Sequence, residues 1–193
     1  MGDRAPGTPV NPAAAGWAET AAARVVAWAR TLPAGPAGRR VLVIEGRSGS
    51  GKTTLAVAVA ARLPAPIIHM DQLYAGWDGL AAGVEALRDR VLEPLARGRP
   101  AVWRQWDWAA GRYTTEHRVP DGDWLIVEGV GAGATGCPIA GTVWLDSPDD
   151  LRRERALARD GDLYAPHWER WARQEEKLPD VRGQAGLIIA NGA

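Results

Sequence analysis

The residues of this chain best suited to chemistry stand in one run, Gly46-Arg47-Ser48-Gly49-Ser50-Gly51-Lys52-Thr53. The run has the Walker A spacing G-x4-G-K-[ST], follows an apolar segment and opens an alanine-rich helical pattern. Glycines let backbone N–H groups turn inward around phosphate oxygens, Lys52 adds positive charge near the outer phosphates, and Thr53 offers its hydroxyl to Mg²⁺. The sequence therefore predicts a loop that binds ATP and Mg²⁺. Its expected ligand contacts are Gly46, Ser48, Gly49, Ser50, Gly51, Lys52, Thr53 and Thr54.

Two acidic residues follow apolar runs that have the character of strands. Asp71 stands in His69-Met70-Asp71-Gln72-Leu73-Tyr74 and is the expected general base, which accepts the proton of an attacking substrate hydroxyl. Glu128 ends Trp124-Leu125-Ile126-Val127-Glu128 and is expected to order Mg²⁺ together with Thr53. A turn aspartate and a solvated loop glutamate are the alternative interpretations. Asp146, at another strand end, fits the site and the following turn equally well.

Four arginines crowd one short segment, at positions 152, 153, 155 and 159. Spacings of three and four residues put several of them on one helix face. Such a cluster suits a lid that closes on phosphates, in which guanidinium groups neutralise the charge that develops during transfer. We therefore expect arginines of this cluster to act with Lys52 and Asp71 in catalysis. A solvated face balanced by Glu154 and Asp160 is the alternative.

An acid between two indoles stands in Arg104-Gln105-Trp106-Asp107-Trp108, and Arg112 and Tyr113 follow. A flat ligand such as a base could stack on an indole while Asp107 accepts hydrogen bonds from sugar hydroxyls. Core packing of the two indoles is an equal alternative. Strand alternation would place both indoles on one face and Asp107 on the other.

The elements that must position these residues alternate along the chain. Apolar runs predict strands near 41–45, 66–70, 124–128, 142–146 and 186–190, and periodic segments predict helices near 52–63, 79–96, 151–160 and 166–178. Ser147-Pro148-Asp149-Asp150 has the pattern of a helix N-terminus with a capping serine. This order predicts a three-layer α/β/α fold with a five-stranded parallel sheet and a helical Arg-rich lid near 151–179. Ligands of such sheets gather at the carboxyl ends of the strands.

The first 39 residues are expected to form an N-terminal extension to a phosphate-binding domain over residues 40–193. Residues 1–13 are rich in Pro, Gly and Ala and predict no structure, and residues 33–39 predict a linker or sharp turn. Between them an apolar stripe predicts one amphipathic helix. Packing of this stripe against the domain is favoured over the binding of a partner. The stripe consists of Trp17, Ala21, Val25, Trp28 and Leu32.

Composition narrows the function classes. Of the 193 residues, 23 are Lys or Arg and 23 are Asp or Glu, so the chain lacks the positive field that holds nucleic acid or an anionic membrane. A small-molecule acceptor is favoured instead. Cys137 is the only cysteine, which excludes an internal disulfide and fits a reducing compartment. His117 and His167 have no zinc-like spacing. No apolar run reaches the ~20 residues of a membrane span, so a cytoplasmic location is expected.

Over residues 40–190 the chain resembles the uridine kinase-like group of P-loop kinases. The Walker A run, Asp71-Gln72-Leu73-Tyr74, Trp106-Asp107-Trp108, Val127-Glu128-Gly129 and the segment Arg155 to Asp160 stand in the order that this group uses. The resemblance implies that Asp71 is the catalytic base and that Arg155 and Arg159 belong to the lid. It also implies substrate contacts at Tyr74, Asp107 and Arg112, and the residues themselves make Trp106 a candidate stacking surface. Residues 71–103 leave little room for a substrate-covering hairpin, and few residues remain near Asn191 to build an adenine pocket.

The resemblance implies an enzyme that uses ATP and Mg²⁺ to phosphorylate a hydroxyl of a small molecule, with a nucleoside as the first acceptor to test. Two alternatives stay open. One is a phosphotransferase that acts on a nucleotide, an antibiotic or another metabolite, because the fold does not decide the acceptor. The other is a nucleotide-dependent regulatory ATPase or switch, in which the helix carrying Trp17 and Trp28 binds a partner.

Overall fold

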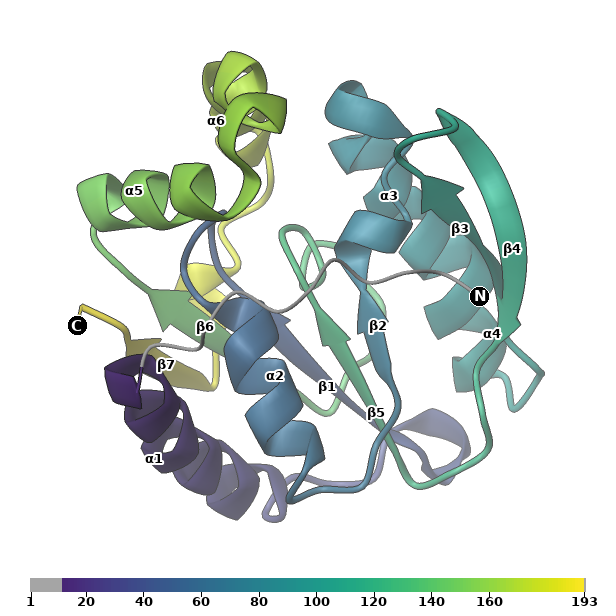
Figure 1. Cartoon of the computed structure of the whole chain (residues 1–193). Coiled ribbons are helices and arrows are strands. Elements are labelled where there is room, and N and C mark those ends of the chain that lie inside the picture. Colours follow the sequence, from purple (N-terminus) through teal and green to yellow (C-terminus); the bar gives the residue numbers. More distant parts are fainter. Residues whose placement is uncertain (1–11, 193) are drawn as a thin grey trace.

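The computed structural model describes residues 12–192. Most of segment 1–13, expected to lack structure, therefore lies outside the described residues. The described chain forms a single parallel sheet with helices on both faces, and a small two-stranded hairpin stands beside it (Figure 1).

The five strands of the sheet are the five that the sequence predicts. They are β1 (Arg40–Glu45), β2 (Ile67–His69), β5 (Trp124–Glu128), β6 (Gly141–Asp146) and β7 (Leu187–Ala190). Their spatial order is β2-β5-β1-β6-β7, and every neighbouring pair is parallel. The α/β class and the five-stranded parallel sheet are thus confirmed. The order also brings the ends of β1, β2 and β5 together, because β5 lies between the other two.

Alternation along the central strand divides the core into two clusters. Leu42 and Ile44 point to the face covered by α1 (Pro12–Ala29) and α2 (Lys52–Ala60). Val41 and Val43 point to the opposite face, which α3 (Leu80–Leu87) and α6 (Trp168–Glu175) cover. A strand that is apolar on both faces needs this three-layer arrangement.

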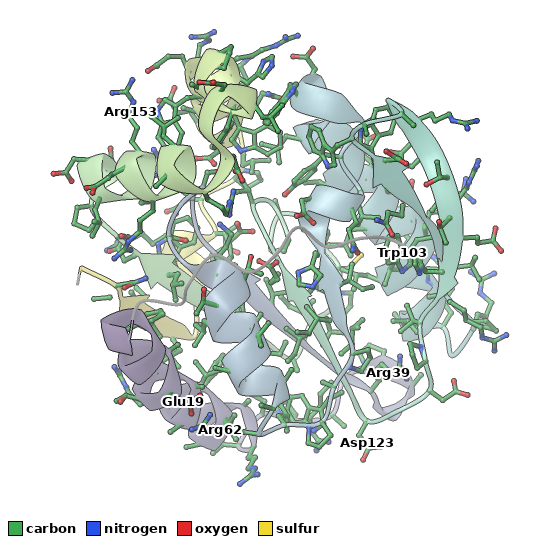
Figure 2. All side chains as sticks on the ribbon, in the orientation of Figure 1. Glu19, Arg39, Arg62, Trp103, Asp123 and Arg153 are labelled. Carbon is green, nitrogen blue, oxygen red and sulfur yellow. The ribbon has the colours of Figure 1, made fainter. Side chains whose placement is uncertain are left out.

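Helix α1 packs against the domain along its apolar stripe. Ala21 and Val25 are buried in the same cluster as α2 and the sheet, and Trp28 packs against that cluster. The Trp17 Nε1 group donates a hydrogen bond to the carbonyl of Ala190 in β7. On the solvent side Glu19 forms an ion pair with Arg62 after α2 (Figure 2). The segment expected to be an extension therefore completes one layer of the domain, and a 3₁₀ turn, η1 (Pro36–Gly38), leads from it towards β1.

The helical segment expected at 79–96 is interrupted. Helix α3 passes into a π-helical turn, η4 (Arg88–Leu92), and then into α4 (Glu93–Ala96). Pro94 lacks an N–H group, and its ring would clash with the carbonyl four residues earlier in a regular α-helix. The widened turn just before Pro94 accommodates both effects.

An antiparallel hairpin follows, formed by β3 (Val102–Asp107) and β4 (Arg112–Arg118). The sequence leaves little room for a hairpin between residues 71 and 103, and this hairpin begins only at the end of that stretch. A register shift between Arg104 and Trp106 interrupts the simple alternation of side chains.

The lid consists of α5 (Asp149–Asp160), two 3₁₀ turns and α6, and it stands above the sheet (Figure 1). The turns are η5 (Gly161–Leu163) and η6 (Ala165–His167). The expected serine cap of α5 is wrong. Pro148 occupies the N-cap position, and the Ser147 hydroxyl donates to the carbonyl of Asn191 instead. A last turn, η7 (Arg182–Gln184), leads into β7.

Candidate phosphate-binding site

The loop between β1 and α2 depends on glycine at two positions. Gly49 has φ +80° and Gly51 has φ +97°, in the left-handed region that favours glycine. A Cβ atom on Gly49 would lie 2.0 Å from the Arg152 carbonyl oxygen. A Cβ atom on Gly51 would lie 2.7 Å from Nδ2 of Asn191. The loop is therefore in close contact with both the lid and the end of β7.

Three side chains far away in the sequence hold this loop. The Ser48 N–H donates to Glu175 Oε1 at 2.9 Å, and Arg152 Nη1 donates to the Ser48 carbonyl at 2.9 Å. Asn191 Nδ2 donates to the carbonyl of Ser50 at 2.8 Å. Arg152, Glu175 and Asn191 are all buried, so these hydrogen bonds are shielded from water. They fix the shape of the loop at both of its ends.

The interior of the loop suits an anion. The first N–H groups of α2, at Lys52, Thr53 and Thr54, lie at the positive end of the helix and have no carbonyl one turn earlier. The Ser50 Oγ atom is buried without a hydrogen-bond partner in the described part of the chain. Lys52 Nζ donates to the Arg47 carbonyl at 2.9 Å, and burial lowers the pKa of this ammonium group. Carboxylates at Glu128, Glu175 and Glu45 oppose that shift.

Glu128 and Thr53 meet as a pair that could hold Mg²⁺. The Thr53 hydroxyl donates to Glu128 Oε1 at 3.0 Å, and Glu128 is buried at the end of β5. His69, at the end of β2, contacts the same oxygen through Nδ1 at 2.6 Å. The described residues contain no group of three or more His, Cys, Asp or Glu side chains that could hold a metal by themselves. Mg²⁺ at phosphate sites is commonly held by one or two protein oxygens together with phosphates and water, so this donor set fits it.

We predict that His69→Ala raises the Mg²⁺ concentration needed for half-maximal effect on ATP binding about tenfold, because Glu128 loses a side-chain partner that orients its carboxylate. Calorimetric titration of ATP at a series of Mg²⁺ concentrations measures this shift. His117→Ala is the matched control, since His117 bonds Gln105 and stacks on Trp103 in the hairpin. Equal Mg²⁺ dependence in the two variants would contradict the role given to His69.

Asp71 lies in η2 (Met70–Gln72), directly after β2, and is exposed. Neighbouring protein desolvates its carboxylate and raises the pKa, and the nearby Glu128 adds to this shift. His69 and Arg159 lower the same pKa. Trp108 Nε1 donates to the Asp71 carbonyl at 3.0 Å and so ties this turn to the hairpin. The structure therefore brings Asp71, Glu128 and the loop to one edge of the sheet.

The lid arginines divide into different roles. Arg159 lies close enough to Asp71 and Lys52 to lower the pKa of both groups. Arg155 turns the other way, where its Nη1 lies 3.3 Å from Ser147 Oγ and 3.4 Å from the Asn191 carbonyl. The expected pair of catalytic arginines is thus split, with Arg159 towards Asp71 and Arg155 at the end of β7.

Two expected substrate contacts also have structural roles. Tyr74 is 4% exposed, and its hydroxyl donates to the Val130 carbonyl at 2.7 Å, so its ring belongs to the core. Asp107 Oδ1 accepts hydrogen bonds from the N–H groups of Ala109 and Ala110 and so stabilises the hairpin turn. Both side chains thus serve the fold, and their contact with a substrate stays a prediction.

The other two expected contacts lie on the hairpin. Trp106 is half-buried, with its ring 5.1 Å from that of Tyr113 in an edge arrangement. Arg112 is exposed on β4, opposite Asp107. Within the described part of the chain, neither residue forms a hydrogen bond or a ring contact with Asp71. Their role in substrate binding stays a prediction.

An aromatic cluster that was not predicted from the sequence connects the lid to the core. Trp77 in η3 (Gly76–Asp78) stacks on His167 at 4.4 Å and on Tyr164 at 5.3 Å. Its ring also lies 4.8 Å from that of Trp108, which is 41% exposed. An ion pair between Arg170 and Asp78 connects the same two segments. The single Trp77 carried no sequence signal, because its partners lie more than 30 residues away.

Glu45, the last residue of β1, was also missed. It is 2% exposed, and its carboxylate accepts N–H groups from Gly46 at 3.1 Å, Gly131 at 2.9 Å and Gly133 at 2.8 Å. It thus joins the phosphate-binding loop to the glycine-rich loop after β5. Burial raises its pKa to about 7, although the three backbone N–H groups and Lys52 oppose that rise. A charged residue that ends an otherwise apolar strand is the signal that could have identified it.

We predict that Glu45 makes the folding stability depend on pH. Its pKa is higher in the folded chain than the ordinary 4.5, so the folded chain binds more protons between pH 4.5 and about 7. Its contribution is fully present below pH 4.5 and is lost as the pH rises to about 7, by about 3 kcal/mol in the free energy of unfolding. Urea unfolding of the wild type and of Glu45→Gln across this range measures the difference. The exposed Glu85→Gln variant should keep the wild-type slope, and a Glu45→Gln curve parallel to the wild type would contradict the assignment.

Comparison with known proteins identifies the fold. The structure is similar to that of a possible uridine kinase from Bacillus stearothermophilus, with a TM-score of 0.65 and 19% identity over 88% of this chain and 97% of that chain. It is also similar to a protein described as a fructose transport system kinase from Silicibacter sp. TM1040, with a TM-score of 0.54 and 21% identity over 88% and 98% of the two chains. The sequence matches no protein-family model and no curated protein. The chain therefore has the P-loop kinase fold, as the sequence resemblance predicted. No helix within residues 12–192 is long and apolar enough to cross a membrane.

Proposed function

We propose that this chain uses ATP and Mg²⁺ to phosphorylate a hydroxyl group of a small molecule, and that the acceptor is a nucleoside or a nucleoside-like compound. One observation carries the proposal. An anion-binding loop, a Thr53–Glu128 pair suited to Mg²⁺ and the exposed carboxylate of Asp71 lie together at the carboxyl ends of β1, β5 and β2. A loop that only bound nucleotide would need no Asp71 beside it. The likeness of the fold to solved P-loop kinases supports the same reading.

The residues divide the work of transfer among them. The loop and Lys52 hold the phosphates of ATP, and Thr53 and Glu128 would hold Mg²⁺, which would supply positive charge beside the phosphate oxygens. Asp71 accepts the proton of the acceptor hydroxyl while the oxygen of that hydroxyl forms a bond to the terminal phosphorus. The bond from that phosphorus to the bridging oxygen breaks, and ADP leaves. Arg159 faces the same space from the lid and balances the developing negative charge.

Indole rings beside Asp71 support a flat acceptor. Trp108 hydrogen-bonds to the Asp71 backbone, and part of its ring surface is exposed next to Trp77. A nucleobase could stack on this exposed surface and so bring a sugar hydroxyl towards Asp71. The sequence left Trp106 and Trp108 open as stacking surfaces; this placement uses Trp108 and gives Asp107 no part in it.

The competing switch hypothesis depended on a free face of α1. That face packs against α2 and β7, which supports the kinase proposal over a switch that binds its partner through α1. A phosphotransferase for another metabolite would have the same sheet and loop, and it would differ only in the space under the lid.

Measurement of ADP release with ATP and Mg²⁺ tests the proposal. The acceptor panel contains nucleosides, nucleotides and hydroxylated metabolites, and each is compared with ATP alone. Stimulation by a nucleoside is the expected result. Stimulation only by another metabolite would overturn the nucleoside as acceptor. Slow turnover that no acceptor increases would overturn the kinase proposal.

A further inference from the structure

The last residue of α6, Glu175, is a buried carboxylate of the lid that the proposed transfer reaction does not use. Its Oε1 atom accepts the Ser48 N–H of the phosphate-binding loop at 2.9 Å. Within residues 12–192 this is the only hydrogen bond of the side chain, and the carboxylate forms no ion pair there. A loop amide is therefore its one direct polar partner.

Two features of this position disfavour a negative charge. Burial removes the carboxylate from water, and buried charges are normally paired. The C-terminal end of a helix also carries partial negative charge, which repels a carboxylate. The compensating attraction comes from the loop, where α2 begins with its free N–H groups and Lys52. Glu175 indeed acts on the Lys52 ammonium group and raises its pKa. A loop that attracts anions thus attracts this one.

Ser48 is the point at which the lid contacts the loop. Arg152 donates to its carbonyl, and a hydrogen bond between its side chain and Tyr164 opposes the rise that burial causes in the pKa of that phenol. Glu175 takes the remaining polar group, the N–H. Of these three lid residues only Glu175 brings a negative charge, and phosphate groups would meet that charge when they enter the loop.

Three carboxylates act on Lys52, and they differ in what balances their charge. Glu128 is paired with Thr53 and would face Mg²⁺ when nucleotide binds. Glu45 accepts three backbone N–H groups. Glu175 accepts one, so its charge is the least balanced of the three when several phosphate charges arrive beside it.

We propose that Glu175 is an internal competitor for the phosphate-binding loop: its carboxylate stands in for a phosphate group at the Ser48 N–H and near Lys52 while the loop is empty, and nucleotide must displace it. The inference rests on the nucleotide binding of the proposed function. Repulsion between the carboxylate and the phosphates weakens the binding of ATP and of ADP. Because differences in affinity appear mainly in the dissociation rate, Glu175 speeds the release of ADP after transfer.

Glu175→Gln is the first test, because the amide oxygen still accepts the Ser48 N–H while the negative charge is gone. We expect this variant to bind ATP about tenfold tighter than the wild type in calorimetric titration with Mg²⁺. A purely structural role for Glu175 predicts unchanged or weaker binding instead. Glu176→Gln is the matched control. Glu176 is the next residue and is exposed, so water screens its charge, and its variant should stay within about twofold of the wild type.

Glu175→Met separates the lost charge from the new amide group of glutamine. Methionine has a similar length and offers neither a charge nor an N–H donor. We expect this variant, too, to bind ATP tighter than the wild type. Tighter binding in Glu175→Gln alone would mean that the new amide donates to a phosphate, and it would overturn the competition. Thermal unfolding of all three variants without nucleotide checks that the fold is intact.

Release of ADP provides an independent measurement. The dissociation rate of a fluorescent ADP analogue, displaced by excess ADP in a stopped-flow instrument, should fall about tenfold in Glu175→Gln and keep its wild-type value in Glu176→Gln. An unchanged rate would overturn the inference, and so would ATP affinity in Glu175→Gln that is equal to or weaker than that of the wild type. These measurements need no acceptor. An acceptor panel without turnover would therefore overturn the kinase proposal and leave the comparison of affinities valid.

Discussion

Replacing Asp71 by asparagine is expected to lower kcat for phosphoryl transfer about 10³-fold and to change ATP affinity less than about twofold. Asparagine has the same shape and keeps the backbone carbonyl that Trp108 bonds, so the turn after β2 should persist. Its amide cannot take a proton from the acceptor hydroxyl. Steady-state kinetics with the best acceptor of the panel, together with calorimetric titration of ATP, measure the two effects.

Asp123→Asn is the matched control for this substitution. Asp123 is exposed and precedes β5 at the amino end of the sheet, far from the loop (Figure 2). Its variant should keep the wild-type kcat. Wild-type turnover in Asp71→Asn would mean that another group accepts the proton, and a loss of ATP binding would mean that Asp71 is needed for the shape of the site.

Gly49→Ala should abolish ATP binding at ordinary concentrations and cost about 3–5 kcal/mol in the free energy of unfolding. Two effects add. The left-handed backbone at φ +80° disfavours alanine by about 1–2 kcal/mol. The new methyl group would also lie 2.0 Å from the Arg152 carbonyl oxygen, so either the loop or the start of α5 must move.

Gly136→Ala separates the two effects. Gly136 has φ +71°, and a Cβ atom there would have no heavy atom within 4 Å. This variant should lose only about 1–2 kcal/mol, and its ATP binding should be unchanged. Urea unfolding and calorimetry on both variants measure the difference, and equal losses in stability would show that the contact between the loop and Arg152 contributes nothing.

Local patterns were sufficient for the sheet and the loop. A Walker A run between an apolar segment and a helical pattern has one common structural solution, and each predicted strand is a short apolar run bounded by turn residues. The hairpin at 102–118 was missed because its residues alternate poorly across the register shift near Gln105. The interruption of the helix before Pro94 was likewise missed, although proline was its visible cause.

The sequence by itself determined the fold class, the loop and the two carboxylates after β2 and β5, because these depend on periodicity and on residues close together in the chain. Only the tertiary structure decided that Tyr74 and Asp107 serve the fold, that Arg155 and Arg159 face different ways, and that Glu45 joins two loops. Those roles depend on partners tens of residues away. Burial, hydrogen bonding and pKa are properties of that three-dimensional neighbourhood, and residue type alone does not carry them.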